Sequence, residues 1–177
     1  ASLRLQKAAR RSAQALDQIA STSPARLVEE PGALPALIAA VAVVCAAAAP
    51  NLQDAAMNSA AVLAGITHDG PKLSRRVAEE PGALPALVAA VAAGGASAAL
   101  SLQDTAIYSA LALASMCKAV PEFVRRVIED PGALSTLVAS VAAGGVTAAR
   151  SLQARAGNSA LVLIQIPDSY IPAASHR

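Results

Sequence analysis

Adjacent carboxylates are the residues of this chain whose type and spacing come closest to an acid–base site. They recur at intervals of 50 residues and are Glu29-Glu30, Glu79-Glu80 and Glu129-Asp130. Two neighbouring carboxyl groups can share the roles of general acid and general base. Here, however, Arg75 and Arg76 are expected to face Glu79 and Glu80 four residues on, and Arg125 and Arg126 likewise to face Glu129 and Asp130, which is typical of a charged helix face. Because successive pairs lie a whole repeat apart, we expect no shared active site.

The other reactive side chains also lack the spacing that catalysis or metal binding needs. His68 and His176 each stand without a Cys, Asp or Glu at ligand spacing. Cys45 and Cys117 occupy non-equivalent positions of different repeats, which is typical of reduced thiols. Gly94-Gly95 is not followed by the Lys-Ser/Thr of a phosphate loop. We therefore expect no enzyme, no catalytic residues, no metal or cofactor and no small-molecule substrate.

The strongest regularity of the chain is a repeat of 50 residues. Pro31, Pro81 and Pro131 each begin Pro-Gly-Ala-Leu, and Leu-Gln and Ser-Ala pairs recur at the same step further on. A fixed period of this size indicates stacked supersecondary units. The first residues align with the end of such a unit, since Leu5-Gln6 matches Leu52-Gln53. We expect a single stack over residues 1–177, divided into a partial leading repeat (1–30), repeats at 31–80 and 81–130, a truncated repeat (131–167) and a tail (168–177).

Each repeat is predicted to contain three helices. Prolines at 71 and 121 suit the first position of a short helix, predicted at 72–80 and 122–130, and the Pro-Gly pair ends it. The second helix begins near Leu34, Leu84 and Leu134, carries apolar residues at i, i+3, i+4 and i+7, and ends near Gly94-Gly95 and Gly144-Gly145 in the later repeats. The third contains the Leu-Gln pair. In the first repeat Val44-Cys45 replaces the glycines, so the second helix is expected to continue toward Pro50, and residues 96–101 fit either a loop or additional helix.

Composition sets further bounds. The 177 residues are 55% hydrophobic and include three aromatic residues. The net charge of +2 is close to zero, so the charge of the chain as a whole does not indicate nucleic-acid binding. Alanine favours helix but buries little area, so the stack should be marginally stable. The uncharged run 33–50 is long enough to suggest a membrane span, but Pro35 and Pro85 interrupt the repeated segment. We expect no membrane span and no secretory leader peptide.

The chain combines a short helix and a Pro-Gly turn with the string Gly-Ala-Leu-Pro-Ala-Leu-Val at 82–88 and the helix ending Ala-Leu-x-x-Ile-Ala at 15–20. This combination resembles the armadillo repeat, with HEAT repeats as a near neighbour. The resemblance covers nearly the whole chain and implies an all-α, right-handed α-solenoid with three helices per repeat. It implies a scaffold that binds protein partners in a concave groove lined by the third helices. The usual armadillo unit is shorter than 50 residues, and the excess here lies around 96–101.

The Trp and Asn ladder of importin-type armadillo proteins is absent. The matching positions are Gln14, Ala61, Leu111 and Leu161 for Trp and Gln18, Gly65, Ser115 and Gln165 for Asn. A nuclear-import groove is therefore not expected. The strings Ser23-Pro24, Val28-Glu29-Glu30 and Gly32-Ala33-Leu34 are also similar to armadillo scaffolds of the ciliary central apparatus. We expect a cytoplasmic protein, with the cilium or axoneme as the alternative and the nucleus ranked below both.

Equivalent positions of the third helices form columns of polar or aromatic residues that helical spacing places on one face. The candidate partner-binding residues from these columns are Lys7, Arg11, Gln18, Asn58, Tyr108, Ser115, Asn158 and Gln165, and Arg10 is added from the basic run at the start of the chain. Tyr108 is the best single anchor, because tyrosine combines a large contact area with a polar tip. The alternative is that it packs against the next repeat. The recurrent Gln6, Gln53, Gln103 and Gln153 are predicted to form a capping or inter-repeat hydrogen-bond ladder.

Basic residues cluster at the start of the chain as Arg4, Lys7, Arg10 and Arg11. This stripe fits an acidic segment of a partner, nucleic acid or plain solvated surface. Nucleic acid is disfavoured because no aromatic residues are interleaved for base stacking and the column of Lys7 turns to Asp54 and Asp104. We expect a non-catalytic protein–protein interaction scaffold. The alternatives are a ciliary or microtubule-associated structural subunit and a nucleic-acid-binding helical repeat protein.

Overall fold

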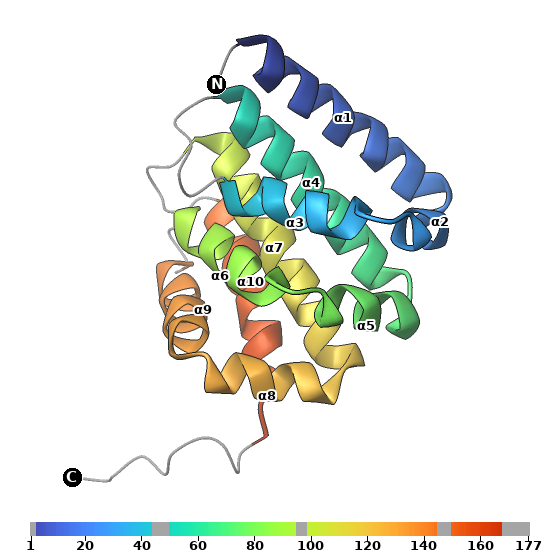
Figure 1. Cartoon of the computed structure of the whole chain (residues 1–177). Helices are drawn as coiled ribbons and strands as arrows, with labels where there is room; N and C mark the ends of the chain where they lie inside the picture. The colour runs from blue at the N-terminus through green and yellow to red at the C-terminus, as the bar shows by residue number, and fades with distance from the viewer. Residues whose placement is uncertain (1–2, 44–49, 95–98, 145–149, 168–177) are drawn as a thin grey trace, which may run out of the picture.

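The computed structural model describes residues 3–43, 50–94, 99–144 and 150–167, and all regular structure in these ranges is α-helical (Figure 1). The prediction of an all-α chain is therefore confirmed. The described residues form ten helices, which are α1 (Leu3–Thr22), α2 (Pro24–Glu29), α3 (Ala33–Val43), α4 (Pro50–His68), α5 (Pro71–Glu79), α6 (Ala83–Ala93), α7 (Leu100–Ala119), α8 (Pro121–Glu129), α9 (Pro131–Ala143) and α10 (Arg150–Ile164).

The helices are arranged in rows that follow the repeat of the sequence. The long helices α1, α4, α7 and α10 pack side by side in chain order, and we call them the third helices. The second helices α3, α6 and α9 form another row, each packed on the third helix of its own unit. The short first helices α2, α5 and α8 lie along one edge (Figure 1). The described residues thus form three three-helix units in succession, with α1 packed on the first of them.

Proline and glycine set the limits of the short helices. Pro24, Pro71 and Pro121 lie in the first turn of α2, α5 and α8, where a missing N–H costs nothing. The last two helices span 71–79 and 121–129, one residue earlier at each end than predicted. After α2 and α5 the chain turns at Gly32 and Gly82, whose φ values of 84° and 83° lie in the left-handed region that favours glycine.

In the third unit the Pro-Gly pair lies inside the second helix and not in a turn. The predicted start of this helix near residue 134 is therefore wrong. Helix α9 begins at Pro131 and contains Gly132. The reason is Asp130, whose Oδ1 accepts hydrogen bonds from the backbone N–H of Gly132 at 2.8 Å and of Ala133 at 2.9 Å. The short aspartate side chain caps the helix, whereas the other two units carry the longer Glu30 and Glu80 at this position.

The second helices end where glycine permits close packing. As predicted, α6 and α9 stop before the glycine pairs. A Cβ atom at Gly94 would lie 2.3 Å from the Ala106 Cβ, and one at Gly144 would lie 2.1 Å from the Ala156 Cβ. The expected continuation of α3 through Val44-Cys45 lies outside the described residues. Of the segment 96–101, residues 96–98 also lie outside them, and α7 includes Leu100 and Ser101.

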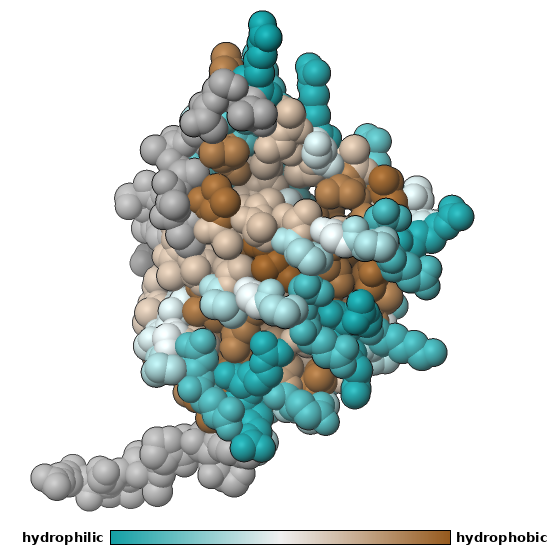
Figure 2. All heavy atoms as spheres, in the orientation of Figure 1, coloured by the Kyte–Doolittle hydropathy of each residue, from teal (hydrophilic) through white to brown (hydrophobic). Residues whose placement is uncertain are grey.

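Equivalent residues of the units form the core between the rows. Leu37, Leu87 and Leu137 are almost completely buried on the second helices, and Leu63 and Leu113 are buried on the third. The second helices carry no charged residue, so their outer face is mostly alanine, while hydrophilic residues gather over the short helices (Figure 2). Within the described residues, no helix combines the length and apolar character needed to cross a bilayer.

Candidate protein-binding surface

The third helices expose a surface with two equivalent hollows, one unit apart. The first, of about 250 Å³, lies between α1 and α4 beside α2, and the second, of about 370 Å³, lies between α4 and α7 beside α5. Pro24 in the first hollow corresponds to Pro71 in the second, and Gly65 corresponds to Ser115. Each hollow forms where a third helix, the following short helix and the next third helix meet.

The two hollows differ in charge. Asp17 and Asp69 line the first hollow, whereas His68 and Lys118 line the second. Gly65 leaves the first hollow open, since a Cβ atom there would meet no atom within 4 Å. The third-helix surface therefore offers an acidic depression followed by a basic one.

The column predicted from Gln18, Gly65, Ser115 and Gln165 lies partly in these hollows. Gly65 and Ser115 line them directly. Gln18 is exposed on α1, and Gln165 is half-buried just beyond α10. Of this column, Gly65 and Ser115 are thus the members that line the hollows.

Comparisons of the chain with protein-family models, with curated proteins and with solved structures found no match.

The column of Arg11, Asn58, Tyr108 and Asn158 lies close to the junctions between units. The Asn158 Nδ2 donates a hydrogen bond of 3.3 Å to the carbonyl oxygen of Ile107 on the preceding third helix. Asn58 is half-buried, whereas Arg11 is exposed. Tyr108 keeps 37% of its surface exposed, so its side chain stays accessible to a partner.

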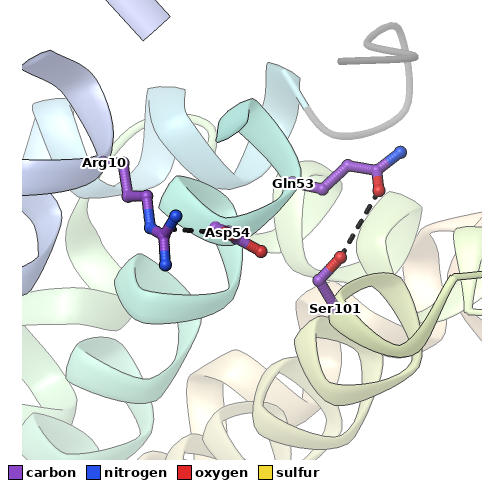
Figure 3. Close-up of polar contacts among 4 residues, drawn as sticks. All are labelled: Arg10, Gln53, Asp54 and Ser101. Carbon is purple, nitrogen blue, oxygen red and sulfur yellow. Dashed lines mark hydrogen bonds and ion pairs between the residues drawn. The ribbon is translucent and has the colours of Figure 1, made fainter. Parts of the chain in front are cut away.

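The column of Lys7, Asp54 and Asp104 also contributes to packing between helices. The Arg10 Nε and the Asp54 Oδ2 form an ion pair of 3.3 Å that joins α1 to α4 (Figure 3). The two side chains are 45% and 30% exposed, so solvent screens the pair and its contribution to stability is small. Arg10, which was predicted to bind a partner, is thus engaged within the chain, while Lys7 is exposed.

The predicted glutamine ladder is confirmed at two junctions. The Ser101 Oγ donates to the Gln53 Oε1 at 3.4 Å (Figure 3), and the Ser151 Oγ donates to the Gln103 Oε1. Both hydrogen bonds connect the third helices of successive units, so these recurrent glutamines have a structural role.

The two arginines that precede the third carboxylate pair, Arg125 and Arg126, make different contacts. Arg125 pairs with Glu129 at 2.8 Å within α8, as predicted for a charged helix face. Arg126 was predicted to face Asp130, and this is wrong. Its guanidinium lies 5.3 Å from the centre of the Phe123 ring and donates to the carbonyl oxygen of Ala78 at the end of α5. A cation at the C-terminus of a helix is favoured by the helix dipole, so Arg126 links two units.

Arg155 is a buried charged residue that the repeat pattern of the sequence did not single out. It is only 4% exposed, and its Nη1 donates to the carbonyl oxygens of Val91 and Gly94 at the end of α6. Burial lowers the pKa of its guanidinium, and its Nε has no hydrogen-bond partner among the described residues. The sequence does contain a signal for this residue, because Arg155 stands at a repeat position that the small residues Ala55 and Thr105 occupy in the earlier units.

The described residues contain no cluster of three or more His, Cys, Asp or Glu side chains that could hold a metal ion. His176 lies outside these residues, as does Cys45. Among them Cys117 is a free, buried thiol on α7.

Proposed function

We propose that this chain is a non-catalytic, armadillo-like scaffold, a right-handed α-solenoid that holds a segment of a partner protein along its third helices. The observation that supports the proposal is the pair of equivalent hollows on the third-helix surface. Stacked units bind by repeating one surface feature along an extended face. We place this scaffold in the cytoplasm, with a ciliary or microtubule-associated assembly as the alternative setting.

The charges of the hollows define the kind of segment that would fit. Asp17 and Asp69 in the first hollow favour a basic side chain, and His68 with Lys118 in the second favours an acidic one. Complementary charges fix the direction and register of a bound segment more than they raise its affinity. The partner is therefore a segment with a basic and an acidic residue separated by the distance between two units.

Affinity capture from a native extract, read by mass spectrometry, tests this proposal. The variant Gly65→Arg/Ser115→Glu fills both hollows with side chains whose charges are opposite in sign to those that line each hollow. A matched control, Ala42→Arg/Ala142→Glu, places the same residues at exposed positions of the second helices. Circular dichroism first establishes that the three proteins have equal helicity.

Partners lost by the first variant and retained by the control would support binding in the hollows. Partners retained equally by both variants would place the interface elsewhere and contradict the proposal. Capture that nuclease treatment abolishes would favour the nucleic-acid alternative.

A further inference from the structure

Four polar side chains of the third unit, at positions where the second unit has Pro, Ala or Thr, line a single hollow. Residues 83–93 of α6 and 133–143 of α9 are identical except at three positions. At these positions α6 has Pro85, Ala86 and Ala90, whereas α9 has the hydroxyl residues Ser135, Thr136 and Ser140. The fourth side chain is Arg155 on α10. The hollow has a volume of about 420 Å³, and we call it the Arg155 pocket.

The Arg155 pocket lies at a junction inside the stack. Val91 and Ala92 of α6 line one side, and Ala139 of α9 lines the other together with the three hydroxyl residues. Both walls therefore belong to helices that the structure describes, the second helices of two successive units. The volume of the pocket falls in the range of sites for small ligands, roughly 300–1,000 Å³.

The pocket leads from the surface to a buried cation. Ser135 is exposed and Thr136 is half-buried. Ser140 is only 3% exposed and Arg155 only 4% exposed. A ligand that entered past the first two residues would therefore meet the guanidinium where little water remains to screen its charge.

The charge of Arg155 is not balanced within the described part of the chain. None of the ion pairs there includes it, and its Nε has no hydrogen-bond partner. Its Nη1 donates to the carbonyl oxygens of Val91 and Gly94, but the C-terminus of a helix offers only about half of a negative charge. The segments that follow α6 and α9 in the chain, 95–98 and 145–149, contain no Asp or Glu. Because an uncompensated buried charge is costly, an anion in the pocket would be favoured.

The hydroxyl groups add hydrogen-bond donors for such an anion. The Ser159 Oγ donates to the Ser140 Oγ at 3.0 Å, so the Ser140 hydroxyl acts there as an acceptor and keeps its own hydrogen to donate. The Ser135 Oγ donates to carbonyl oxygens of its own helix and can rotate toward a new acceptor. A phosphate group has three strong acceptor oxygens and a charge of about −1.5 to −2, so it uses more of these donors than a carboxylate with its two oxygens.

We propose that the Arg155 pocket binds a phosphate group, either as the free ion or as part of a small phosphate monoester. Arg155 supplies the positive charge and its Nε–H group, and the hydroxyl residues of α9 supply further hydrogen bonds. The pocket is separate from the two hollows on the third-helix surface, so the proposal goes beyond the scaffold function above and either can fail alone.

Nuclear magnetic resonance of the isotope-labelled protein tests the proposal, with sodium phosphate as the probe at constant pH and ionic strength. The signal of the Arg155 Nε–H group is identified by its absence from the spectrum of the Arg155→Gln variant. We expect phosphate at about millimolar concentration to shift this signal in a saturable way, together with the amide signals of Thr136 and Ser140, because a charged acceptor then bonds to the Nε–H group. A purely structural arginine would show no such shift.

Two variants with matched controls separate the roles of charge and hydroxyl groups. Ser135→Ala/Thr136→Val keeps Arg155 and should bind phosphate about tenfold more weakly. Its control, Ser21→Ala/Thr22→Val, removes the same pair of side chains from exposed positions of α1 and should bind as the native protein does. Arg155→Gln should abolish the saturable shifts, whereas Arg150→Gln changes the net charge equally at an exposed position of α10 and should retain them. Circular dichroism establishes that each variant is folded, and if Arg155→Gln is not, the hydroxyl variant decides.

The proposal is overturned if phosphate leaves the Arg155 Nε–H signal unchanged, or if the Ser135→Ala/Thr136→Val variant binds phosphate as tightly as the native protein. Sodium acetate and glycerol phosphate are titrated in the same way. Tighter binding of acetate than of phosphate would show a carboxylate site and contradict the proposal. Tighter binding of glycerol phosphate than of the free ion would support it and identify a monoester as the ligand, whereas the reverse order would support it with the free ion as the ligand.

Discussion

At the scale of single residues, the glycines of this chain have two opposite roles. Gly94 and Gly144 lie where a second helix touches a third helix, and a Cβ atom there would overlap Ala106 or Ala156. Gly65 and Gly157 lie on exposed helix surface, where a Cβ atom would meet nothing within 4 Å. The first two are required by packing, whereas the others only weaken the helices that contain them.

We predict that Gly65→Ala raises the free energy of unfolding by about 0.5–1 kcal/mol, because alanine costs less backbone entropy in a helix. Gly94→Ala should lower it by about 1–3 kcal/mol, because the added methyl group overpacks the contact with Ala106. Urea denaturation followed by circular dichroism measures both values. A Gly94→Ala protein as stable as the native one would show that the two helices are not in close contact.

Because of Cys117, the free energy of unfolding is expected to fall at high pH. Burial raises the pKa of its thiol to about 12 from an ordinary value of 9.0. Below pH 9 the thiol is neutral in both states, so its contribution is fully present. Between pH 9 and pH 12 only the unfolded chain ionises, and stability falls by up to about 1.4 kcal/mol per pH unit.

We predict that the Cys117→Ala variant loses this part of the pH dependence, so that its unfolding free energy falls less steeply above pH 9 than that of the native protein. Urea titrations across this range provide the comparison, and Cys45 is common to both proteins. Parallel curves would mean that Cys117 ionises as readily in the folded state as in the unfolded one.

At the scale of the helix, the third unit shows how one side chain moves a boundary. Helix α9 begins two residues earlier in its unit than α3 and α6 because Asp130 accepts hydrogen bonds from two backbone N–H groups. In the second unit the N-cap position of α6 is Gly82, which provides no side-chain cap. The repeated Pro-Gly pair thus lies in a turn twice and inside a helix once.

We predict that Asp130→Ala destabilises the protein by about 1 kcal/mol, as expected for the loss of an N-cap. Asp130→Asn, which keeps a side-chain acceptor, should cost only a few tenths of that amount. Glu80→Ala serves as the control in the uncapped unit. Equal effects of Asp130→Ala and Glu80→Ala on the denaturation midpoint would argue against the cap.

At the scale of the whole molecule, each unit is stabilised mainly by its neighbours. Helices α4 and α7 pack against third helices on both sides. In the last unit Val138 is 56% and Ile164 71% exposed, whereas the equivalents Val88 and Ala114 are 8% exposed. The difference arises because a following unit covers Val88 and Ala114.

We predict that amide hydrogen exchange follows this arrangement, with the slowest exchange in α6 and α7 and the fastest in α1 and α9. In a stack of units local opening begins where few neighbours pack. Exchange measured by mass spectrometry on peptides from each helix checks the order. Uniform protection from α1 to α10 would instead indicate that all units unfold together.

The helices and their order follow from signals that lie close together in the sequence. The 50-residue period, the prolines at helix starts and the glycines at turns are local signals, and most helix limits agree with them. The charged pairs were interpreted as structural, and Arg125 with Glu129 supports this. The inter-unit role of Gln53 and Gln103 was also predicted, because a repeated polar residue on equivalent helices faces the same neighbour in each unit.

Which polar residues remain available to a partner depends instead on how the helices pack in three dimensions. Helical spacing places Arg10, Arg11 and Gln18 on one helix, but it does not tell which of them faces α4. Likewise, Arg126 and Arg155 reach carbonyl oxygens of the preceding unit, 48 and 61–64 residues away. The burial of Ser59 and Ser109 is also invisible in the sequence, because exposure depends on which helices pack around a residue and not on the residue itself.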